Sequence, residues 1–167
     1  MKKIVIKGYE FKFIEKLVPI YKKTSIEKEK LNKYKGRELV SSLQKDININ
    51  NAKIEEINFC KFKLLSDKID KSGVYLWVIN NEIVYIGEAS NLKKRFNSGY
   101  GNISARNIFK GGQSTNCKMN RIAMQCFEKN IDINIYFYET SNYKKVEQEL
   151  LEYNKRENKW NLYNSKI

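Results

Sequence analysis

Histidine is absent from this chain of 167 residues, and its absence excludes a large set of chemistries. Without histidine there is no Ser-His-Asp triad, no Cys-His pair and no histidine ligand for zinc. Any acid–base chemistry must therefore come from tyrosine, lysine, glutamate, aspartate or water.

Cysteine and long apolar runs are scarce as well. The three cysteines, Cys60, Cys117 and Cys126, are too few and too scattered for a Cys-only zinc site, and their odd number argues against a secreted disulfide scaffold. We expect Cys117 and Cys126 to pack as small apolar side chains.

Because charges interrupt every apolar run, the sequence predicts no signal peptide and no membrane span, and we expect a soluble, cytoplasmic protein.

Acidic residues are outnumbered by basic ones, 19 against 32, which gives a formal net charge of +13. Such a surplus favours polyanionic partners, nucleic acid first and an anionic membrane second. The window Ala89–Phe127 holds no acidic residue at all. We expect this basic window to face phosphates, and a solvated basic face without a partner is the alternative.

The clearest local signal is a β-hairpin. Two β-rich segments, 73–79 and 82–87, flank the pair Asn80-Asn81, and asparagine tolerates the positive φ that a two-residue turn requires. Alternation places Tyr75, Trp77 and Ile79 on one face of the first strand. A further alternating, aromatic segment at 131–138 predicts a third strand.

Helices are predicted around these strands. Ser90 or Asn91 caps a short helix over 92–96, and a loop rich in glycine and asparagine follows over 98–112. A second helix begins at Ser114 or Thr115, and its buried stripe consists of Met119, Ile122, Ala123, Cys126 and Phe127. The last helix is expected over 143–155.

These elements predict an α+β fold with a small, three-stranded, mainly antiparallel sheet flanked by helices in residues 71–167. A chain of this length is one domain or a domain with an arm. Residues 1–70 are expected to form that N-terminal, β-rich arm, with short strands at 4–6, 11–13 and 59–64 and a helix at 37–45.

Glu147 is the candidate carboxylate of the last helix. At 100° per residue it lies between Leu150 and Leu151, whereas Glu149 and Glu152 are expected to point towards solvent. A carboxylate beside an apolar seam is costly unless it binds a cation or an arginine. The alternative is a boundary residue whose carboxylate reaches water.

Several of these residues form an ordered set. The segments Gly73-Val74-Tyr75 and Val84-Tyr85-Ile86-Gly87 resemble the motif pair of the GIY-YIG nuclease superfamily, with valine in place of isoleucine in the first motif. Arg95 matches the arginine on the helix that follows the second motif, and Glu147 matches the single glutamate of a later helix. Trp160-Asn161 resembles the terminal asparagine of the family.

The resemblance covers about residues 72–162 and implies the GIY-YIG fold and a Mg²⁺-dependent DNA endonuclease with one metal ion, for which Mn²⁺ can substitute. It implies that Tyr75 is the general base and that Tyr85 orients Tyr75 or the water. Arg95 would stabilise the transition-state charge and Glu147 would bind the metal. Asn161 would position Glu147 or the phosphate.

The resemblance is greatest to the small type II restriction endonucleases of the superfamily, in which a tyrosine replaces histidine as the proposed base. The implied partner is double-stranded DNA, with a homodimer on a palindromic site left open. Gln125 is a candidate for groove or backbone contact, and the other candidates for DNA contact are Lys93, Lys94, Arg106, Lys110, Gln113, Asn116, Lys118 and Arg121.

Other functions stay open at this point. A DNA repair nuclease or a mobile-element nuclease fits the chain nearly as well as a restriction enzyme. A non-catalytic nucleic-acid-binding module would keep the sheet and the basic surface without cleavage. A ribosome-associated or RNA-binding protein would fit the charge, although the sequence has no RNP-like aromatic pair.

Overall fold

The computed structural model describes residues 2–50 and 53–164, and its contacts divide the chain into two compact units. Unit 1 consists of Met1–Leu17, Leu64–Arg95 and Ile131–Ile167, and unit 2 consists of Val18–Lys63 and Phe96–Asn130. Each unit is therefore built from segments that are not contiguous in sequence. The expected boundary near residue 70 stays a prediction.

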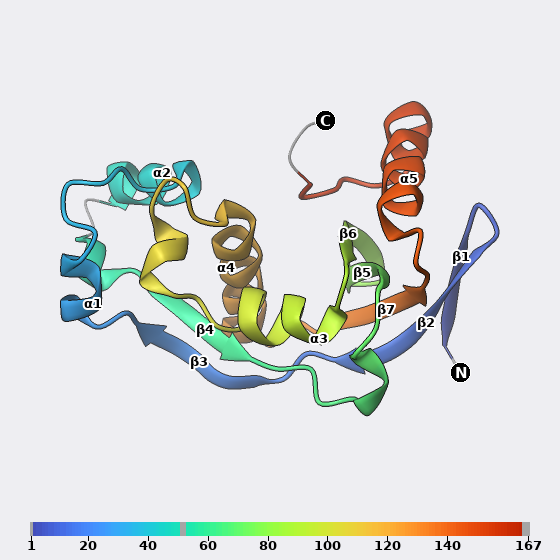
Figure 1. Ribbon diagram of the computed structural model, residues 1–167, viewed down its shortest axis with the longest axis horizontal. Coiled ribbons are helices and arrows are strands. Elements are labelled where there is room, and N and C mark those ends of the chain that lie inside the picture. The colour runs from blue at the N-terminus through green and yellow to red at the C-terminus, as the bar shows by residue number, and fades with distance from the viewer. Residues whose placement is uncertain (1, 51–52, 165–167) are drawn as a thin grey trace. The chain divides into compact units, whose positions relative to one another are not determined.

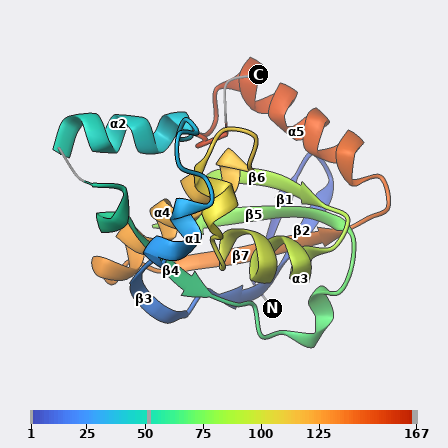
Figure 2. The same cartoon turned by 60° about the vertical axis from the view of Figure 1, so that its left-hand side comes forward.

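Unit 1 contains an antiparallel sheet with the strand order β1-β2-β7-β5-β6 (Figures 1 and 2). The five strands are β1 (Lys3–Ile6), β2 (Tyr9–Lys16), β5 (Gly73–Ile79), β6 (Glu82–Ala89) and β7 (Ile133–Glu139). The α+β class and the antiparallel pairing agree with the sequence prediction. The sheet has five strands instead of the expected three, because two strands of the N-terminal arm join it through β7.

Local sequence explains the two hairpins of this sheet. Asn80 and Asn81 join β5 to β6 with φ values of 51° and 65°, as the turn signal predicted. Lys7 and Gly8 join β1 to β2 with φ values of 51° and 85°. The pairing between β2 and β7 is long-range, with Phe13 opposite Tyr136.

Helix α5 (Tyr143–Glu157) packs against β5 and β6 and covers one face of the sheet (Figure 1). Its Val146 and Leu150 join the core cluster that contains the β5 side chains Val74, Leu76 and Val78. Tyr75, Trp77 and Ile79 alternate with these residues along β5, as the sequence pattern predicted, and all three are buried.

Helix α3 (Leu92–Lys94) is shorter than expected. Asn91 caps it, and the Asn91 side-chain oxygen accepts a hydrogen bond of 2.8 Å from the backbone N–H of Lys94. The chain then continues as a π-helical turn, Arg95–Tyr100. The expected loop 98–112 is thus only partly a loop, because it holds the end of this turn and a 3₁₀ helix, Ala105–Ile108.

Unit 2 contains a two-stranded antiparallel sheet, and α4 packs on both of its strands. Strand β3 and helix α1 were not predicted from the sequence. The regular elements of unit 2 are β3 (Pro19–Ser25), α1 (Lys28–Asn32), α2 (Ser41–Asn50), the 3₁₀ helix Ile54–Glu56, β4 (Asn58–Phe62) and α4 (Ser114–Glu128).

The inward side of α4 carries the predicted stripe, and of its five members only Ile122 is half-buried instead of buried. A polar residue, Asn120, is also fully buried on α4. Its side-chain oxygen accepts from the Cys60 backbone N–H at 3.0 Å, and its amide donates to the carbonyls of Cys60 at 2.9 Å and Tyr100 at 2.6 Å. Asn120 therefore ties α4 to β4 and to the end of the π-helical turn.

The three cysteines are free and buried, so the expected packing of Cys117 and Cys126 as small apolar side chains is confirmed. Burial raises the pKa of both the Cys60 and the Cys117 thiols to about 12, and it also raises the pKa of Cys126.

Across residues 2–50 and 53–164, no helix has the length and apolar character needed to cross a membrane.

Candidate active site

Tyr75 and Arg95, two of the predicted catalytic residues, are in contact within unit 1. The Arg95 Nε donates a hydrogen bond of 3.3 Å to the Tyr75 hydroxyl oxygen. The Tyr85 ring lies beside the Tyr75 ring, with 6.3 Å between their centroids. A guanidinium that donates to a phenol oxygen stabilises negative charge on that oxygen. The pair can therefore hold a phenolate or bind an anion.

Gly87 makes this arrangement possible. It lies opposite Tyr75 in the pairing of β5 with β6. A Cβ atom at Gly87 would lie 2.4 Å from the Tyr75 hydroxyl oxygen and 2.5 Å from its Cζ. The glycine of the second motif thus leaves the space that the Tyr75 phenol occupies.

Glu147, on α5, is half-buried and interacts with the same region. Burial and the neighbouring Glu88 carboxylate raise the pKa of Glu147 to about 7, while a hydrogen bond from the Glu88 backbone and the Arg95 guanidinium lower it. Arg95 is therefore close enough to act electrostatically on both Tyr75 and Glu147. Glu88 was not singled out from the sequence, although it directly follows the second motif.

Glu149 was expected to point towards solvent, and the structure differs from this prediction. Its carboxylate accepts a hydrogen bond of 2.7 Å from the Tyr9 hydroxyl of β2. The helical-wheel argument considered only α5, and β2 comes from a distant part of the chain. Glu152 is exposed as expected and accepts a hydrogen bond from Gln148.

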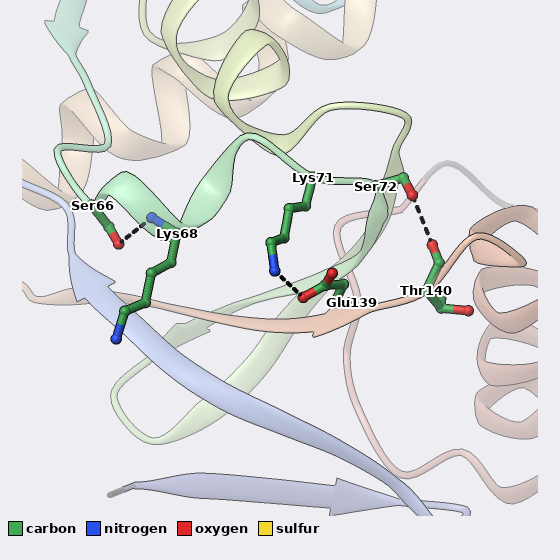
Figure 3. A network of polar contacts seen from close by, with 6 residues as sticks. All are labelled: Ser66, Lys68, Lys71, Ser72, Glu139 and Thr140. Carbon is green, nitrogen blue, oxygen red and sulfur yellow. Dashed lines mark hydrogen bonds and ion pairs between the residues drawn. The ribbon is translucent and has the colours of Figure 1, made fainter.

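Polar contacts hold the segment before β5 against the end of β7 (Figure 3). Lys71 forms an ion pair of 2.7 Å with Glu139. The Ser72 hydroxyl donates to the Thr140 carbonyl at 3.0 Å, and the Thr140 N–H donates back to the Ser72 carbonyl at 3.1 Å. These bonds fix the start of β5 and with it the position of Tyr75.

The same segment also holds α3. The Lys71 carbonyl accepts a hydrogen bond of 2.9 Å from the backbone N–H of Leu92, and the Asn91 side chain donates to Asp70. Tyr75 lies in β5 and Arg95 directly follows α3, and both elements are anchored to residues 70–72.

Glu147 and Glu88 are the two carboxylates of this region that could hold one Mg²⁺ ion. In the part of the chain that the structure describes, no group of three or more His, Cys, Asp or Glu residues could hold a metal. Mg²⁺ needs fewer protein ligands than that, because it binds through one or two carboxylates and keeps waters and phosphate oxygens as its other ligands. A divalent cation would also offset the repulsion between the two carboxylates.

Asn161 is not brought together with the other four predicted catalytic residues. It is exposed and lines a cavity with Asn81 and Glu82, at the turn end of the hairpin. The tail asparagine that contacts the motif is Asn164, whose side chain accepts from the Ile86 N–H at 3.1 Å and donates to the Ile86 carbonyl at 2.7 Å. The only sequence signal for Asn164 was its place in the same short tail.

The predicted DNA contacts differ in exposure. Asn116 is only 2% exposed, and its side chain donates to Gln113 at 2.8 Å, so its amide offers little surface to a ligand. Lys118 and Arg121 are half-buried. The exposed candidates are Lys93 and Lys94 in unit 1 and Arg106, Lys110, Gln113 and Gln125 in unit 2, with Lys110 paired to Glu38.

In comparisons with known proteins, no family model, no curated protein and no solved structure matches this chain.

Proposed function

We propose that the protein is a Mg²⁺-dependent endonuclease of the GIY-YIG type that hydrolyses phosphodiester bonds in double-stranded DNA. The observation that carries the proposal is the contact of Arg95 with the Tyr75 hydroxyl, together with the electrostatic influence of Arg95 on Glu147. The three residue types in that order were the ones that the motif resemblance implied. All three lie in unit 1.

Phosphodiester hydrolysis requires an activated water, neutralisation of the phosphate oxygens and stabilisation of the leaving oxygen. In the proposed mechanism the Tyr75 phenolate takes a proton from the attacking water, whose oxygen bonds to phosphorus. The bond from phosphorus to the 3′ oxygen breaks, and that leaving oxygen takes a proton from solvent. Arg95 stabilises the phenolate before the proton transfer and binds a non-bridging phosphate oxygen through its planar fork. Glu147, assisted by Glu88, would hold Mg²⁺, which supplies positive charge beside the phosphate and the leaving oxygen.

Tyr75 is 0% exposed, so this mechanism requires a rearrangement that admits water to its hydroxyl. Arg95 is only half-buried and lies directly against that hydroxyl. A movement of the Arg95 side chain that keeps its Nε on the Tyr75 oxygen and brings its terminal nitrogens to a bound phosphate would open this side of Tyr75. Substrate binding and activation of the base are thereby linked through one side chain.

The first test is cleavage of unmethylated phage DNA with Mg²⁺ and with EDTA. We expect Mg²⁺-dependent cleavage that Glu147→Gln abolishes while DNA binding changes by no more than a few-fold, because the substitution removes a metal ligand and not a phosphate contact. Glu152→Gln is the matched control on the same helix and should stay active. A folded wild-type protein that cuts with neither Mg²⁺ nor Mn²⁺ would refute the proposal.

The pattern of products tests the biological role. We propose restriction of foreign DNA, for which the products should be discrete bands that mark a fixed recognition site. A smear would keep the nuclease activity and favour a repair or mobile-element nuclease.

A further inference from the structure

Unit 1 contains a cavity of about 760 Å³ that has no part in the proposed reaction. Its apolar lining residues are Ile4, Ile83 and Trp160. Asn81, Glu82 and Asn161 contribute two amides and a carboxylate, and Lys159 contributes a cation. An aromatic surface beside several hydrogen-bonding groups is typical of sites that bind nucleobases.

Trp160 is held in place by the side chain of a single residue. The Asn154 side-chain oxygen accepts a hydrogen bond of 2.8 Å from the Trp160 N–H, and the Asn154 amide donates to the Trp160 carbonyl at 3.0 Å. These bonds fix the backbone that carries the Trp160 ring, so less of the tail has to be ordered when a ligand binds.

Three cations gather beside this cavity around the ring of Tyr153. The Lys7 Nζ, the Arg156 Cζ and the Lys159 Nζ lie 5.6, 5.9 and 5.2 Å from the ring centroid. The Trp160 ring lies 6.1 Å from the same ring. The three cations give the surroundings of this ring a positive charge that a bound anion would offset. Glu157 offsets part of it through its ion pair of 2.9 Å with Arg156.

We propose that this cavity binds an unpaired nucleotide of the DNA substrate. The base stacks on Trp160, the amides of Asn81 and Asn161 donate to carbonyl oxygens of its edge, and the Glu82 carboxylate accepts from a ring N–H or an amino group. Lys7, Arg156 and Lys159 bind the adjoining phosphates. The identity of the ligand as DNA rests on the proposed function.

The hairpin fixes the distance from this cavity to the candidate active site. Glu82 lines the cavity and pairs with Ile79, which is four strand residues from Tyr75, and this corresponds to about 13 Å at roughly 3.3 Å per residue. Along a DNA strand, that is about four nucleotides at roughly 3.4 Å each. The unpaired nucleotide would then lie about four positions from the cut, as a base that is turned out of the duplex.

Binding of a tetrathymidylate, dT4, without divalent metal tests the proposal apart from cleavage. The chain has two tryptophans, and Trp77 is fully buried, so quenching by dT4 should come from Trp160. We expect dT4 to quench the emission of the wild type and of Glu147→Gln equally. Trp160→Phe should lose the quenching and keep a ring on which the base can stack.

Charge variants test the phosphate side of the cavity. Arg156→Ala and Lys159→Ala, both at exposed positions, should each weaken dT4 binding at least fivefold. Lys144→Ala, an exposed cation in the first turn of α5, is the matched control and should change binding less than twofold. Equal melting temperatures will show that the variants are folded.

Two results would overturn the proposal. One is the absence of quenching by dT4 at millimolar concentration, and the other is equal weakening by Lys144→Ala and Lys159→Ala. Cleavage of a blunt duplex together with either result would leave the nuclease proposal standing. Quenching by dT4 without any cleavage would support the nucleotide site and refute the nuclease.

Discussion

Glu147 is a carboxyl group that becomes harder to ionise when the protein folds. Its pKa rises from the ordinary 4.5 to about 7, chiefly through burial. The folded protein therefore binds the proton of the Glu147 carboxyl group more tightly than the unfolded chain does. The contribution of this tighter binding to stability is complete below pH 4.5 and is lost as the pH rises through 7. Glutamine does not ionise, so Glu147→Gln does not lose stability in this way. Without divalent metal, we expect the variant to be more stable than wild type at pH 8 by about 1–2 kcal/mol, after allowing for partial exposure.

Urea unfolding at pH 4.5 and at pH 8 measures this difference, which should vanish at the lower pH. Adding Mg²⁺ at pH 8 should raise the stability of the wild type and leave Glu147→Gln unchanged, because only the wild type keeps the proposed ligand. The exposed Glu152→Gln serves as the reference. A Glu147→Gln variant less stable than wild type at pH 8 would contradict the burial of an ionised carboxylate.

The role of Tyr75 as base leads to a prediction about how the cleavage rate depends on pH. The rate with a histidine base stops rising once the imidazole is deprotonated, but this chain has no histidine. An unperturbed tyrosine has a pKa of about 10, so its phenolate is rare at neutral pH. We expect the Mg²⁺-dependent cleavage rate to keep rising through pH 8, and Tyr75→Phe to reduce it at least a hundredfold while DNA binding persists. Single-turnover kinetics measure both.

A rate that is flat between pH 7 and 9, with the chemical step limiting, would count against tyrosine as the base. Near-normal cleavage by Tyr75→Phe would assign the role of base to Tyr85, a residue that is 7% exposed and whose ring lies beside that of Tyr75.

At the scale of elements, Asn120 makes α4 depend on a polar contact inside unit 2. Its three hydrogen bonds satisfy both backbone groups of Cys60 and the carbonyl of Tyr100. Asn120→Ala would leave these buried groups without partners, so we expect it to lower the free energy of unfolding by about 3 kcal/mol. Denaturant unfolding measures this value. Gln125→Ala, on the exposed side of α4, should change it by less than about 0.5 kcal/mol.

Elements with a strong local signal were predicted well from the sequence. The turn at Asn80-Asn81, the Asn91 cap and the start of α5 at Tyr143 each depend on residues close in sequence. Strand β3 was missed because its residues are mostly exposed and lack an alternating pattern. The addition of β1 and β2 to the sheet depends on pairing with β7, which no local pattern encodes.

The candidate site likewise contains residues that could be predicted from the sequence and residues that could not. Tyr75, Arg95 and Glu147 could be chosen because their order along the chain matches a motif, and the structure relates all three through Arg95. Asn161 was predicted because Trp160-Asn161 resembles the terminal asparagine of the family. The tail turns so that Asn164, three residues later, pairs with Ile86 instead. A side chain at the end of a non-helical segment has no periodicity that could predict its direction.

For the whole molecule, the surplus of positive charge leads to a prediction about DNA binding. The window Ala89–Phe127 holds seven basic residues. If five or six of them contact phosphates, DNA binding should weaken as salt is added. A plot of the logarithm of the binding constant against the logarithm of the salt concentration should then have a slope of about −5. Titrations of a duplex in EDTA between 50 and 300 mM salt measure the slope. A slope near zero would mean that the basic window does not face DNA.

The five-stranded sheet leads to a prediction about the predicted boundary near residue 70. A fragment of residues 71–167 lacks β1 and β2 and loses the core residues Ile6 and Phe11. It would expose the edge of β7 and part of the core of unit 1, so we expect it not to fold cooperatively. Circular dichroism with thermal melting tests this. A cooperative transition in the fragment would support a self-sufficient C-terminal domain.

The position of β7 between β2 and β5 has a consequence for biosynthesis. A ribosome releases the β1–β2 hairpin before β7, so Phe13 acquires its partner Tyr136 only after more than 120 further residues have been synthesised. During that interval the hairpin presents an open strand edge that can pair with another nascent chain. Slower translation would lengthen the exposure, so the yield of native protein should depend on chaperone supply more than on the stability of the finished fold.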